Sequence, residues 1–447
     1  MAPVVRGGPK FHIETWGCQM NVLDSQRMAG MLESHGYEPV DSRDEADVLV
    51  LNTCDVREKA EWKVYSELGR LNQWKRERAG RLIGLAGCLA QRLGSRILEN
   101  IPAVDLVVGT GNVERLPEAV ENARRQRVAL LDLPTDSPAY QFRSISRPSK
   151  FQAFVTVIEG CDQFCTFCVV PFTRGRERSR RACEIEQEVR LLAESGFTEI
   201  TLLGQTVNAY SCPDLGLALG GLLTRLSRIE GVRRLRFLTS HPAFVTDDLI
   251  EALADTGSIA PFFHLPAQSG SDRILARMKR RYTSDQYRHI VDRVRRRVPR
   301  IEFSSDFIVG FPGESDADFD QTMRMVAEVR FASLFAFLYS CRPGTAAARW
   351  GDRDEVARDV ASARLERLFE LQRSIQREDN RRLEGSDVEV LIDGESNEGL
   401  AWTGRTACNR VVHIDKDSVR DVDVGAFVHA RVQRALEHSL IAASARG

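Results

Sequence analysis

Short apolar runs alternate with longer amphipathic segments in the first third of the chain. The apolar runs predict β-strands at residues 11–15, 48–51, 82–86 and 104–109, and the segments between them predict helices at residues 22–35 and 55–79. Strands that alternate with helices form a parallel sheet. We therefore expect an N-terminal parallel α/β domain over residues 9–131, followed by a Pro- and Ser-rich linker over residues 132–150.

The same alternation resumes after the linker. Strands are predicted at residues 154–159, 199–203, 235–239, 262–265, 302–309 and 333–339, with helices between them such as residues 182–195, 247–256 and 284–298. Six βα units are too few for a complete eight-stranded barrel. We expect a partial (β/α)6 barrel over residues 151–380, with its functional groups at the C-terminal ends of the strands.

The last part of the chain has a different pattern. Residues 354–384 predict a long helix rich in Arg and Glu, and short alternating segments then predict strands at residues 388–392, 410–414, 427–432 and 439–442. This pattern indicates a small antiparallel β-barrel, similar to an OB-fold, over residues 381–445. Barrels of this kind often bind single-stranded nucleic acid.

Composition narrows the class of protein. The formal net charge is −1, and only seven of the 62 basic residues are Lys, so an Arg cluster alone is weak evidence for nucleic-acid binding. The ten Cys suit a reducing compartment better than a disulfide framework. Residues 1–10 have no apolar signal-peptide core, and no apolar run is long enough to span a bilayer. We expect a soluble cytoplasmic protein that acts as a monomer.

Cys161, Cys165 and Cys168 form a C-x3-C-x2-C triplet. Thiolates are the usual ligands of iron–sulfur clusters, and three of them would leave one iron of a [4Fe–4S] cluster open to a small molecule. A zinc site would want a fourth ligand, but there is no second C-x2-C and no His within twenty residues. The triplet could also contain a disulfide, or it could be three unrelated buried cysteines.

A second set of cysteines is dispersed through the N-terminal domain. Cys18, Cys54 and Cys88 each follow a predicted strand, with separations of 36 and 34 residues. Because parallel α/β folds place ligands at the C-terminal edge of the sheet, these three should converge there, where they could ligate a second cluster with an open iron. They could instead be small core residues, one at each strand end.

The triplet and several other blocks resemble the radical S-adenosylmethionine methylthiotransferase family over nearly the whole chain. The flanks of the triplet read Glu-Gly-Cys-Asp-Gln-Phe-Cys-Thr-Phe-Cys-Val-Val-Pro-Phe-Thr-Arg-Gly. The other blocks include Gly17-Cys18-Gln19-Met20-Asn21, Asn52-Thr53-Cys54-Asp55, Gly87-Cys88-Leu89-Ala90-Gln91, His264-Leu265-Pro266-Ala267-Gln268-Ser269-Gly270-Ser271 and Ser304-Ser305-Asp306-Phe307. The blocks at residues 17–21 and 264–271, together with Thr403-Gly404-Arg405-Thr406, resemble the branch of the family that modifies tRNA.

The resemblance implies a methylthiotransferase domain, a radical core and a C-terminal TRAM domain. It implies that two [4Fe–4S] clusters and S-adenosylmethionine, used as radical source and as methyl donor, methylthiolate C2 of N(6)-isopentenyladenosine next to the anticodon of tRNA. A deoxyadenosyl radical would abstract the C2 hydrogen, so no acid–base residue is required. An electron donor such as a flavodoxin or ferredoxin would be a partner.

Four polar residues fall at or near the C-terminal ends of the predicted barrel strands: Gln205, Ser240, Gln268 and Asp306. They are candidates to contact S-adenosylmethionine, although such residues can also simply cap strands.

Candidate RNA contacts come from two Arg-rich stretches and from the last domain. Arg174 and Arg176 belong to the stretch after the triplet, a second stretch spans residues 278–281, and Arg405 and Arg410 belong to the last domain. That domain holds 11 acidic and seven basic residues over residues 384–447, whereas RNA-binding modules usually present a basic face. Both stretches could instead be solvated charged surface.

Two further functions remain open from the sequence. One is the branch of the family that methylthiolates an aspartate of a small-subunit ribosomal protein. The second is a non-catalytic iron–sulfur RNA-binding protein.

Overall fold

The computed structural model describes residues 7–55, 58–136, 140–350, 354–396, 399–419 and 422–445. Its N-terminal domain contains a six-stranded parallel sheet in the order β2-β1-β3-β4-β5-β6. The strands are β1 (Lys10–Trp16), β2 (Glu38–Pro39), β3 (Val48–Thr53), β4 (Leu82–Gly87), β5 (Leu106–Val108) and β6 (Val128–Leu130). The helices are α1 (Gln19–Ser34), α2 (Glu58–Glu77), α3 (Cys88–Leu93), α4 (Arg96–Asn100) and α5 (Leu116–Ala123).

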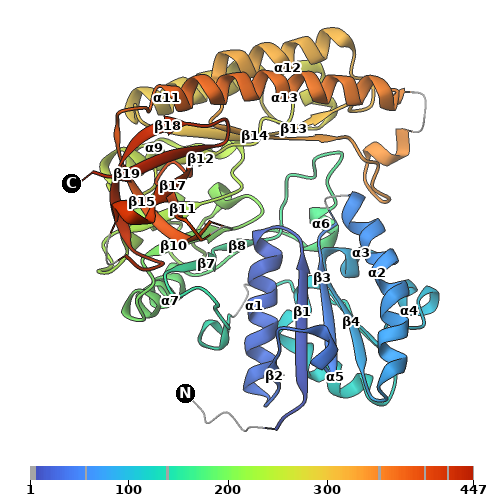
Figure 1. Cartoon of the computed structure of the whole chain (residues 1–447). Helices are drawn as coiled ribbons and strands as arrows, with labels where there is room; N and C mark the ends of the chain where they lie inside the picture. Colours follow the sequence, from blue (N-terminus) through green and yellow to red (C-terminus); the bar gives the residue numbers. More distant parts are fainter. Residues whose placement is uncertain are drawn as a thin grey trace.

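Helices cover both faces of this sheet (Figure 1). Successive side chains of a strand point to opposite faces. Val48 and Val50 of β3 accordingly pack with residues of α1 and α5, whereas Leu49 and Leu51 pack with residues of α2, α3 and α4. A strand buried on both faces reads as one continuous apolar run, which is why β3, β4 and β5 were predicted. The short strands β2 and β6, which are not fully buried, were missed.

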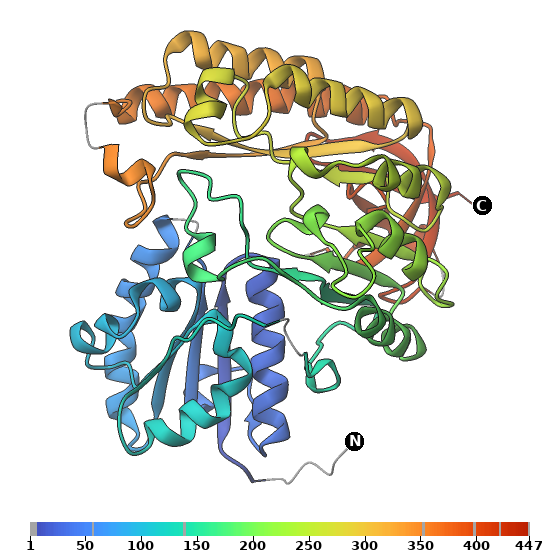
Figure 2. The ribbon, with the colours of Figure 1, turned by 180° about the vertical axis from the view of Figure 1, so that it is seen from behind.

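The second domain contains six parallel strands in two groups of three, β7-β10-β11 and β12-β13-β14. The strands are β7 (Gln152–Thr156), β10 (Glu199–Leu203), β11 (Arg234–Phe237), β12 (Phe262–His264), β13 (Glu302–Val309) and β14 (Ser333–Leu338). A parallel bridge between Leu235 and Ile259 connects the two groups. The outer helices are α7 (Ala182–Glu194), α8 (Leu219–Leu226), α9 (Asp247–Asp255), α10 (Asp272–Arg277), α11 (Ser284–Arg297) and α12 (Asp316–Val329). Figure 2 shows α11 and α12 at the top of the molecule, away from the N-terminal domain.

One predicted barrel strand, at residues 154–159, is interrupted. β7 ends at Thr156, and Ile158 and Glu159 form a separate strand, β8 (Ile158–Glu159). β8 pairs in antiparallel fashion with β9 (Arg178–Ser179), which lies beyond the cysteine triplet. The loop that carries the triplet is therefore closed at its base by a two-stranded ribbon.

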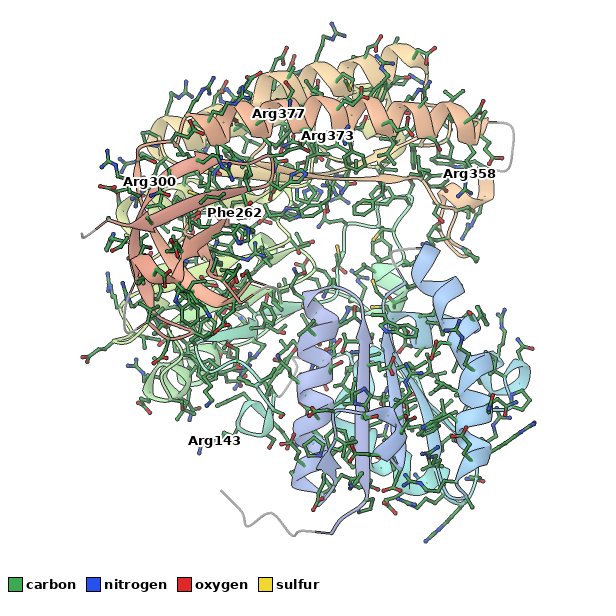
Figure 3. The ribbon with its side chains drawn as sticks, in the orientation of Figure 1. Arg143, Phe262, Arg300, Arg358, Arg373 and Arg377 are labelled. Atoms are coloured by element: carbon green, nitrogen blue, oxygen red, sulfur yellow. The ribbon has the colours of Figure 1, made fainter. Side chains whose placement is uncertain are left out.

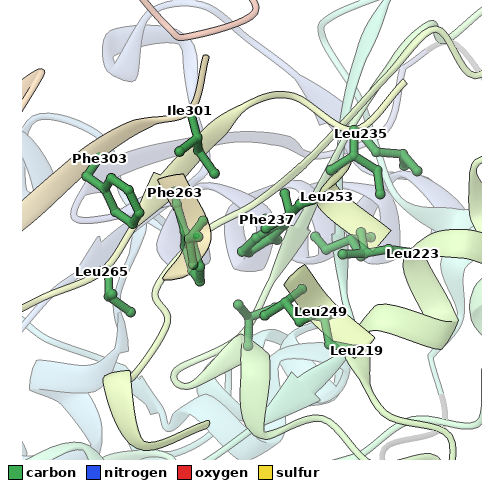
Figure 4. Packing of buried hydrophobic residues seen from close by; sticks show 14 of the residues in the cluster. Leu219, Leu223, Leu235, Phe237, Leu249, Leu253, Phe263, Leu265, Ile301 and Phe303 are labelled. Atoms are coloured by element: carbon green, nitrogen blue, oxygen red, sulfur yellow. The ribbon is translucent and has the colours of Figure 1, made fainter. Parts of the chain in front are cut away.

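Aromatic side chains form a row in the core of the second domain (Figure 4). The rings of Phe237 and Phe263 meet edge to face at 5.3 Å, and those of Phe263 and Phe303 are stacked at 5.8 Å. The three residues come from β11, β12 and β13 and are essentially inaccessible to solvent. Such pairs contribute about 0.5–1.5 kcal/mol beyond area burial, and this row spans the junction between the two strand groups.

The third domain follows the long helix α13 (Arg358–Arg381) and is a closed five-stranded barrel in the order β15-β16-β17-β19-β18. Its strands are β15 (Asp387–Glu395), β16 (Ala401–Thr406), β17 (Val411–Asp415), β18 (Phe427–Ala435) and β19 (Ser439–Ser444). Only four of them were predicted. β16 was missed because it contains Gly404, where a Cβ atom would overlap the carbonyl of Leu391, so the position has no side chain to mark the alternation.

Arginine side chains of α13 and of the second domain form ion pairs and hydrogen bonds with this β-barrel. Arg373 and Arg377 lie along α13 above the barrel (Figure 3), and Arg377 pairs with Glu437 at 3.0 Å. From the second domain, Arg236 donates to the carbonyls of Thr406 and Ala407, both at 2.9 Å. The predicted fold class, a parallel α/β domain, a partial six-stranded barrel and a small β-barrel, is confirmed. The last barrel was predicted to be antiparallel, and it is so except for one parallel pair, β17 with β19.

Candidate active site

Cys161, Cys165 and Cys168 lie in the loop between β8 and the short helix α6 (Val170–Thr173). The loop is held by backbone hydrogen bonds to distant segments: the amide of Thr166 donates to the carbonyl of Met278 at 3.1 Å, and its carbonyl accepts from the amide of Ala347 at 2.8 Å. Cys161 and Cys165 are buried, and Cys168 is partly buried. The three thiols therefore belong to one ordered loop at the end of the first barrel strand.

Gly160 allows this loop to turn directly before Cys161. Its φ of +78° favours glycine, and a Cβ there would overlap the carbonyl of Arg176. The Gly160 amide donates to Gln205 Oε1 at 2.5 Å, and Thr206 Oγ1 lies 3.4 Å from Cys161 Sγ. The residues that follow β10 thus support the start of the loop.

Burial keeps two of these thiols in the protonated form. It raises the pKa of Cys161, and it raises the pKa of Cys168 to about 12, with a further contribution from the charge of Cys165. Metal ligation requires the thiolate, so binding of iron here must release protons.

Cys18, Cys54 and Cys88 follow the ends of three neighbouring strands, β1, β3 and β4. Trp16 pairs with Thr53 and Thr53 pairs with Gly87, so the three strands end at the same level. The amide of Cys54 donates to the carbonyl of Trp16 at 3.0 Å. Strand register therefore brings three cysteines that are distant in sequence to one edge of the sheet.

Buried amides hold this edge together. Asn21 Nδ2 donates to Asn52 Oδ1 at 3.1 Å, and Asn52 Nδ2 donates to the Asn21 carbonyl at 2.8 Å. Asn21 Oδ1 also accepts from the backbone amide of Cys18 at 3.3 Å. Gly87 has φ +91° and ψ −161°, and a Cβ there would lie 2.6 Å from the Thr53 carbonyl. The Asn and Gly that accompany these cysteines in the sequence therefore set their positions.

The three thiols of this edge differ in their ionisation. A hydrogen bond from Cys54 lowers the pKa of Cys18 to about 6, and the positive charge of Arg174 contributes to the shift. Burial raises the pKa of Cys88, and the positive charge of Arg174 opposes that effect. At neutral pH this edge thus holds one thiolate and a nearby guanidinium.

Arg174 was expected to contact RNA, but in the structure its side chain is buried between the first two domains. Its side chain is only 5% exposed and donates to Asp24 Oδ2 at 2.6 Å. Arg174 follows α6, which packs against α3, the helix that begins with Cys88. Figures 1 and 2 both show α6 beside the N-terminal domain. A buried, ion-paired side chain is not available to a phosphate, so the expected RNA contact is corrected.

A second buried network connects the two cysteine sets. Arg27 on α1 lies 3.4 Å from Glu159, which stands two residues before Cys161, and Arg178 lies 3.2 Å from the same carboxylate. The hydroxyl of Tyr140 donates to Glu159, and the guanidinium groups of Arg27 and Arg180 lie 4.3 Å from its ring centroid. Burial alone would raise the pKa of Glu159, but the charge of Arg27 and its neighbours lowers it. Sequence patterns gave no signal for this long-range network.

The remaining candidate RNA contacts are divided between the surface and the interior. Arg176 is exposed and pairs with Asp162, and Arg405 is about half exposed and pairs with Asp393. Arg410 is mostly buried, where it bonds Glu302 and Asn380, so its expected RNA contact is also corrected. In the stretch at residues 278–281, Arg280 lies 3.5 Å from Cys165 Sγ and does not point to solvent as RNA binding would require.

Two candidate cofactor residues carry buried polar atoms without a protein partner. They are Gln205, through Nε2, and Ser240, through Oγ. Leaving a buried polar atom unpaired costs roughly 1–3 kcal/mol, so such atoms mark a place where a polar ligand fits. Both residues lie just beyond strand ends, Gln205 after β10 and Ser240 after β11.

The second pair of candidates, Gln268 and Asp306, lie side by side. Gln268 has φ +69°, and its amide donates to the Asp306 carbonyl at 2.8 Å. Asp306 lies inside β13, three residues before its end, and its carboxylate is 3.6 Å from His264 Nε2. The inner face of this half of the barrel is therefore polar at its centre.

Phe335 is a residue that the sequence reasoning missed. It is 51% exposed, and its ring meets that of His264 edge to face at 6.4 Å. Leu334 and Ala336, its neighbours in β14, are buried in the core that includes residues of α13. Because strand side chains alternate, Phe335 points to the inner face of the barrel. The alternation of residues 333–338 could have revealed it.

The donor sets fit iron–sulfur clusters better than a single metal ion. Within the described ranges, no three His, Cys, Asp or Glu side chains are spaced to bind one ion. In a [4Fe–4S] cluster each thiolate ligates a different iron, so the ligands lie further apart than those of one ion. The two sets of three thiols, one in the loop after β8 and one at the ends of β1, β3 and β4, supply the donor type that such clusters use.

Three parts of the chain match known families. Residues 10–109 match the family described as Uncharacterized protein family UPF0004, residues 155–326 match the Radical SAM superfamily, and residues 381–443 match the TRAM domain. The fold, the cysteine triplet and these matches define the class: a radical S-adenosylmethionine protein with an additional N-terminal domain and a C-terminal TRAM domain.

Curated relatives match the chain from end to end. It is 43% identical over 436 residues to the tRNA-2-methylthio-N(6)-dimethylallyladenosine synthase of Geobacter sulfurreducens, covering 96% of both chains. It is 41% identical over 434 residues to the protein of the same name from Syntrophotalea carbinolica, covering 96% of this chain and 98% of that one. The chain belongs to the family of these tRNA-2-methylthio-N(6)-dimethylallyladenosine synthases.

Solved structures share the fold at low identity. The radical S-adenosylmethionine methyltransferase TsrM from Kitasatospora setae, with cobalamin and a [4Fe–4S] cluster bound, aligns with a TM-score of 0.56 at 14% identity over 76% of this chain and 77% of that one. The cobalamin-dependent S-adenosylmethionine radical enzyme OxsB aligns with a TM-score of 0.53 at 11% identity over 83% and 58% of the respective chains. At these identities the similarity concerns the fold alone.

Proposed function

We propose that this enzyme methylthiolates C2 of N(6)-dimethylallyladenosine in tRNA, next to the anticodon. The observation that carries the proposal is the presence of two sets of three cysteines, one at three strand ends of the N-terminal domain and one in the loop that follows the first strand of the barrel. Membership of the synthase family supports the substrate. The ribosomal-protein branch and a non-catalytic role are not favoured, because the curated relatives that match over 96% of the chain are tRNA-modifying synthases.

Each set of cysteines would hold one [4Fe–4S] cluster. Cys161, Cys165 and Cys168 would bind the cluster that acts with S-adenosylmethionine, and Cys18, Cys54 and Cys88 would bind the auxiliary cluster. When bound, these groups supply radical generation and a site for the sulfur to be inserted. The chain itself orients them: Gly160 and Gln205 shape one loop, and Asn21 and Asn52 hold the edge of the N-terminal sheet.

Gln205, Ser240, Gln268 and Asp306 would contact S-adenosylmethionine. The unpaired Gln205 Nε2 and Ser240 Oγ support hydrogen bonds to its polar groups. The Asp306 carboxylate is an acceptor for a ribose hydroxyl or an amino group. None of these residues has to exchange a proton with the substrate, which agrees with radical abstraction at a carbon.

Phe335 would contact the dimethylallyl group of the target adenosine. It is a large apolar side chain exposed on an inner face that also carries the polar His264 and Asp306 and, two residues further along β14, the partly exposed Phe337. An apolar substituent on an otherwise polar base is the part of the substrate that gains from such a contact. The base must leave the stack of the anticodon loop to reach this face.

Several finer points belong to the same proposal. We assign residues 9–131, 151–380 and 381–445 to the three domains, with residues 132–150 as the linker. Arg176 and Arg405 are exposed and would contact tRNA phosphates.

The enzyme would act as a monomer in the cytoplasm and take electrons from a flavodoxin or ferredoxin, since cleavage of S-adenosylmethionine needs one electron. No helix in the described ranges is long and apolar enough to cross a membrane.

The experiment is nucleoside analysis of tRNA from a strain that lacks this gene. Loss of 2-methylthio nucleosides is expected, with accumulation of the N(6)-dimethylallyl precursor. Wild-type protein should restore them, and the Cys161→Ala variant should not. An unchanged nucleoside profile in the deletion strain would rule out the proposal.

A further inference from the structure

Arg174 stands between the two domains, with its charged group buried at the N-terminal cysteine edge. The side chain is 5% exposed and its Nη2 lies 2.6 Å from Asp24 Oδ2. Asp24 belongs to α1, the helix that starts directly after Cys18. The guanidinium therefore reaches from the loop after the Cys161 triplet to the helix that follows a cysteine of the N-terminal set.

The ion pair does not account for the whole environment of Arg174. Its charge also acts on the thiols of Cys18 and Cys88, and α6, which Arg174 follows, packs against α3, the helix that begins with Cys88. Within the hydrogen bonds of this region, Arg174 is held to one oxygen of Asp24, while Arg27 lies 3.7 Å from the second oxygen. A guanidinium has five N–H donors in a fixed fork, so donors remain for a group at the cysteine edge.

Burial gives this charge a large effect. Coulomb interactions are strong and weakly screened in a low-dielectric site. A [4Fe–4S] cluster ligated by three thiolates carries net negative charge and becomes more negative when it is reduced. A fixed positive charge beside two of the thiolates therefore favours the reduced form, and hydrogen bonds to the sulfurs act in the same direction.

We propose that Arg174 is a positioning residue whose positive charge sets the reduction potential of the cluster at Cys18, Cys54 and Cys88. The negative charge of Asp24 partly offsets the effect of Arg174. The inference rests on the proposed function, because it requires that auxiliary cluster. It also explains why Arg174, which follows the loop of Cys161, Cys165 and Cys168, points away from solvent. The domain that makes the radical would in this way contribute a charge to the cluster of the N-terminal domain.

The test uses full-length protein carrying Cys161→Ala, Cys165→Ala and Cys168→Ala, so that only the auxiliary cluster is bound. Its potential is measured by redox titration followed by electron paramagnetic resonance. In this background Arg174→Gln is expected to lower the potential, by about 59 mV for a tenfold change in a one-electron equilibrium. Arg174→Lys keeps the charge and should stay near the starting value.

Asp24→Asn makes the test specific, because it breaks the same ion pair and removes the opposite charge. We expect it to raise the potential. If the pair were merely structural, the two variants would act alike, so shifts of the same sign, or no shift in either variant with the cluster still bound, overturn the inference. If the Arg174→Gln variant binds no cluster, the inference is tested by Asp24→Asn alone. In that case a reduction potential that does not rise in Asp24→Asn overturns the inference.

Arg178→Gln is the matched control. Arg178 comes from the same stretch and is also buried, but it pairs with Glu159 at 3.2 Å and with the Asp136 carbonyl at 3.0 Å. Because Glu159 also interacts with Arg174, loss of Arg178 should shift the potential far less than Arg174→Gln does, and a shift as large as that of Arg174→Gln overturns the inference. Absence of iron from the parent background would instead contradict the auxiliary cluster, and with it the proposed function.

Discussion

Phe335 and Asp306 are register partners in the adjacent parallel strands β14 and β13, and both face the interior of the barrel. Asp306 has a side chain that is 31% exposed, and Phe335 is 51% exposed, while the residues on either side of Phe335 are buried against helices. An apolar ring and a carboxylate are thereby presented together to the space where the substrate base is proposed to lie.

Replacing Phe335 by Ala should weaken the preference for dimethylallylated tRNA over tRNA with an unmodified adenosine. Apolar contacts of this size discriminate by about 1–3 kcal/mol, or roughly 10–200-fold in kcat/KM. The measurement compares kcat/KM for the two tRNAs. Phe335→Leu keeps an apolar surface and serves as the control. An equal loss on both substrates, with the ratio unchanged, would show that Phe335 does not contact the dimethylallyl group.

His241 should make stability depend on pH. Burial, together with the charges of Arg280 and Arg281, lowers the pKa of His241 from 6.5 to about 2. The unfolded chain binds a proton near pH 6.5 and the folded chain does not, so stability is present above pH 6.5 and falls as the pH decreases below it. Between pH 6.5 and 5 the loss is about 2 kcal/mol.

The comparison is made between wild type and His241→Asn by chemical denaturation at pH 7 and pH 5. The variant should lose less stability on acidification, whatever its stability at pH 7. His438→Asn is the control, because the His438 side chain is 68% exposed. Equal losses in the wild type and His241→Asn would contradict the assignment of the pH dependence to His241.

Gly87→Ala should impair the auxiliary cluster selectively. Its φ of +91° with ψ −161° is a region that only glycine occupies readily, and a Cβ would crowd Thr53 and Asn52 at the edge that carries Cys54 and Cys88. We expect a cost of about 1–3 kcal/mol and reduced iron at this site. Iron content with Mössbauer spectra measures it.

Gly69→Ala is the matched control for this substitution. Gly69 lies in α2, and a Cβ there meets no atom within 4 Å. Ala in a helix is preferred over Gly by roughly 0.5–1 kcal/mol, so this variant should be as stable as the wild type or more stable, and should keep both clusters. Retention of full iron by Gly87→Ala would contradict the role given to the glycine.

Substitution of either cysteine set should halve the iron. Anaerobically reconstituted protein is expected to hold about eight irons, and replacement of Cys161, Cys165 and Cys168 by Ala should leave about four. Replacement of Cys18, Cys54 and Cys88 should also leave about four. The control is Cys183→Ala, an exposed cysteine outside both sets. Iron loss confined to the control would contradict the assignment of the ligands.

Arg176 and Arg410 should affect tRNA binding differently. Arg176 is 74% exposed, so Arg176→Ala should weaken binding and reduce its dependence on salt. Arg410 fastens the last domain to Glu302 and Asn380, so Arg410→Ala should mainly lower the unfolding temperature. Binding measured at two salt concentrations, with thermal unfolding, separates the effects. A normal salt dependence in Arg176→Ala would contradict the first expectation.

The convergence of Cys18, Cys54 and Cys88 on one sheet edge, most of the strands and the three-part organisation could be predicted from the sequence. Strands buried on both faces are continuous apolar runs, and glycines and asparagines beside cysteines report local backbone requirements. The interruption after Thr156 and the strand Ala401–Thr406 could not be read, because the first depends on pairing with β9 and the second on a glycine without a side chain.

What only the tertiary structure decided is the direction in which charged side chains point. The sequence does not distinguish Arg174, Arg176 and Arg178, which are arginines of one short stretch. In the structure Arg174 reaches the edge that carries the N-terminal cysteines, Arg176 faces solvent and Arg178 binds Glu159. Their partners lie 150, 14 and 19 residues away in the sequence. Local patterns determine elements and their order, whereas the partner of a long charged side chain depends on which distant segments the packed domains bring together.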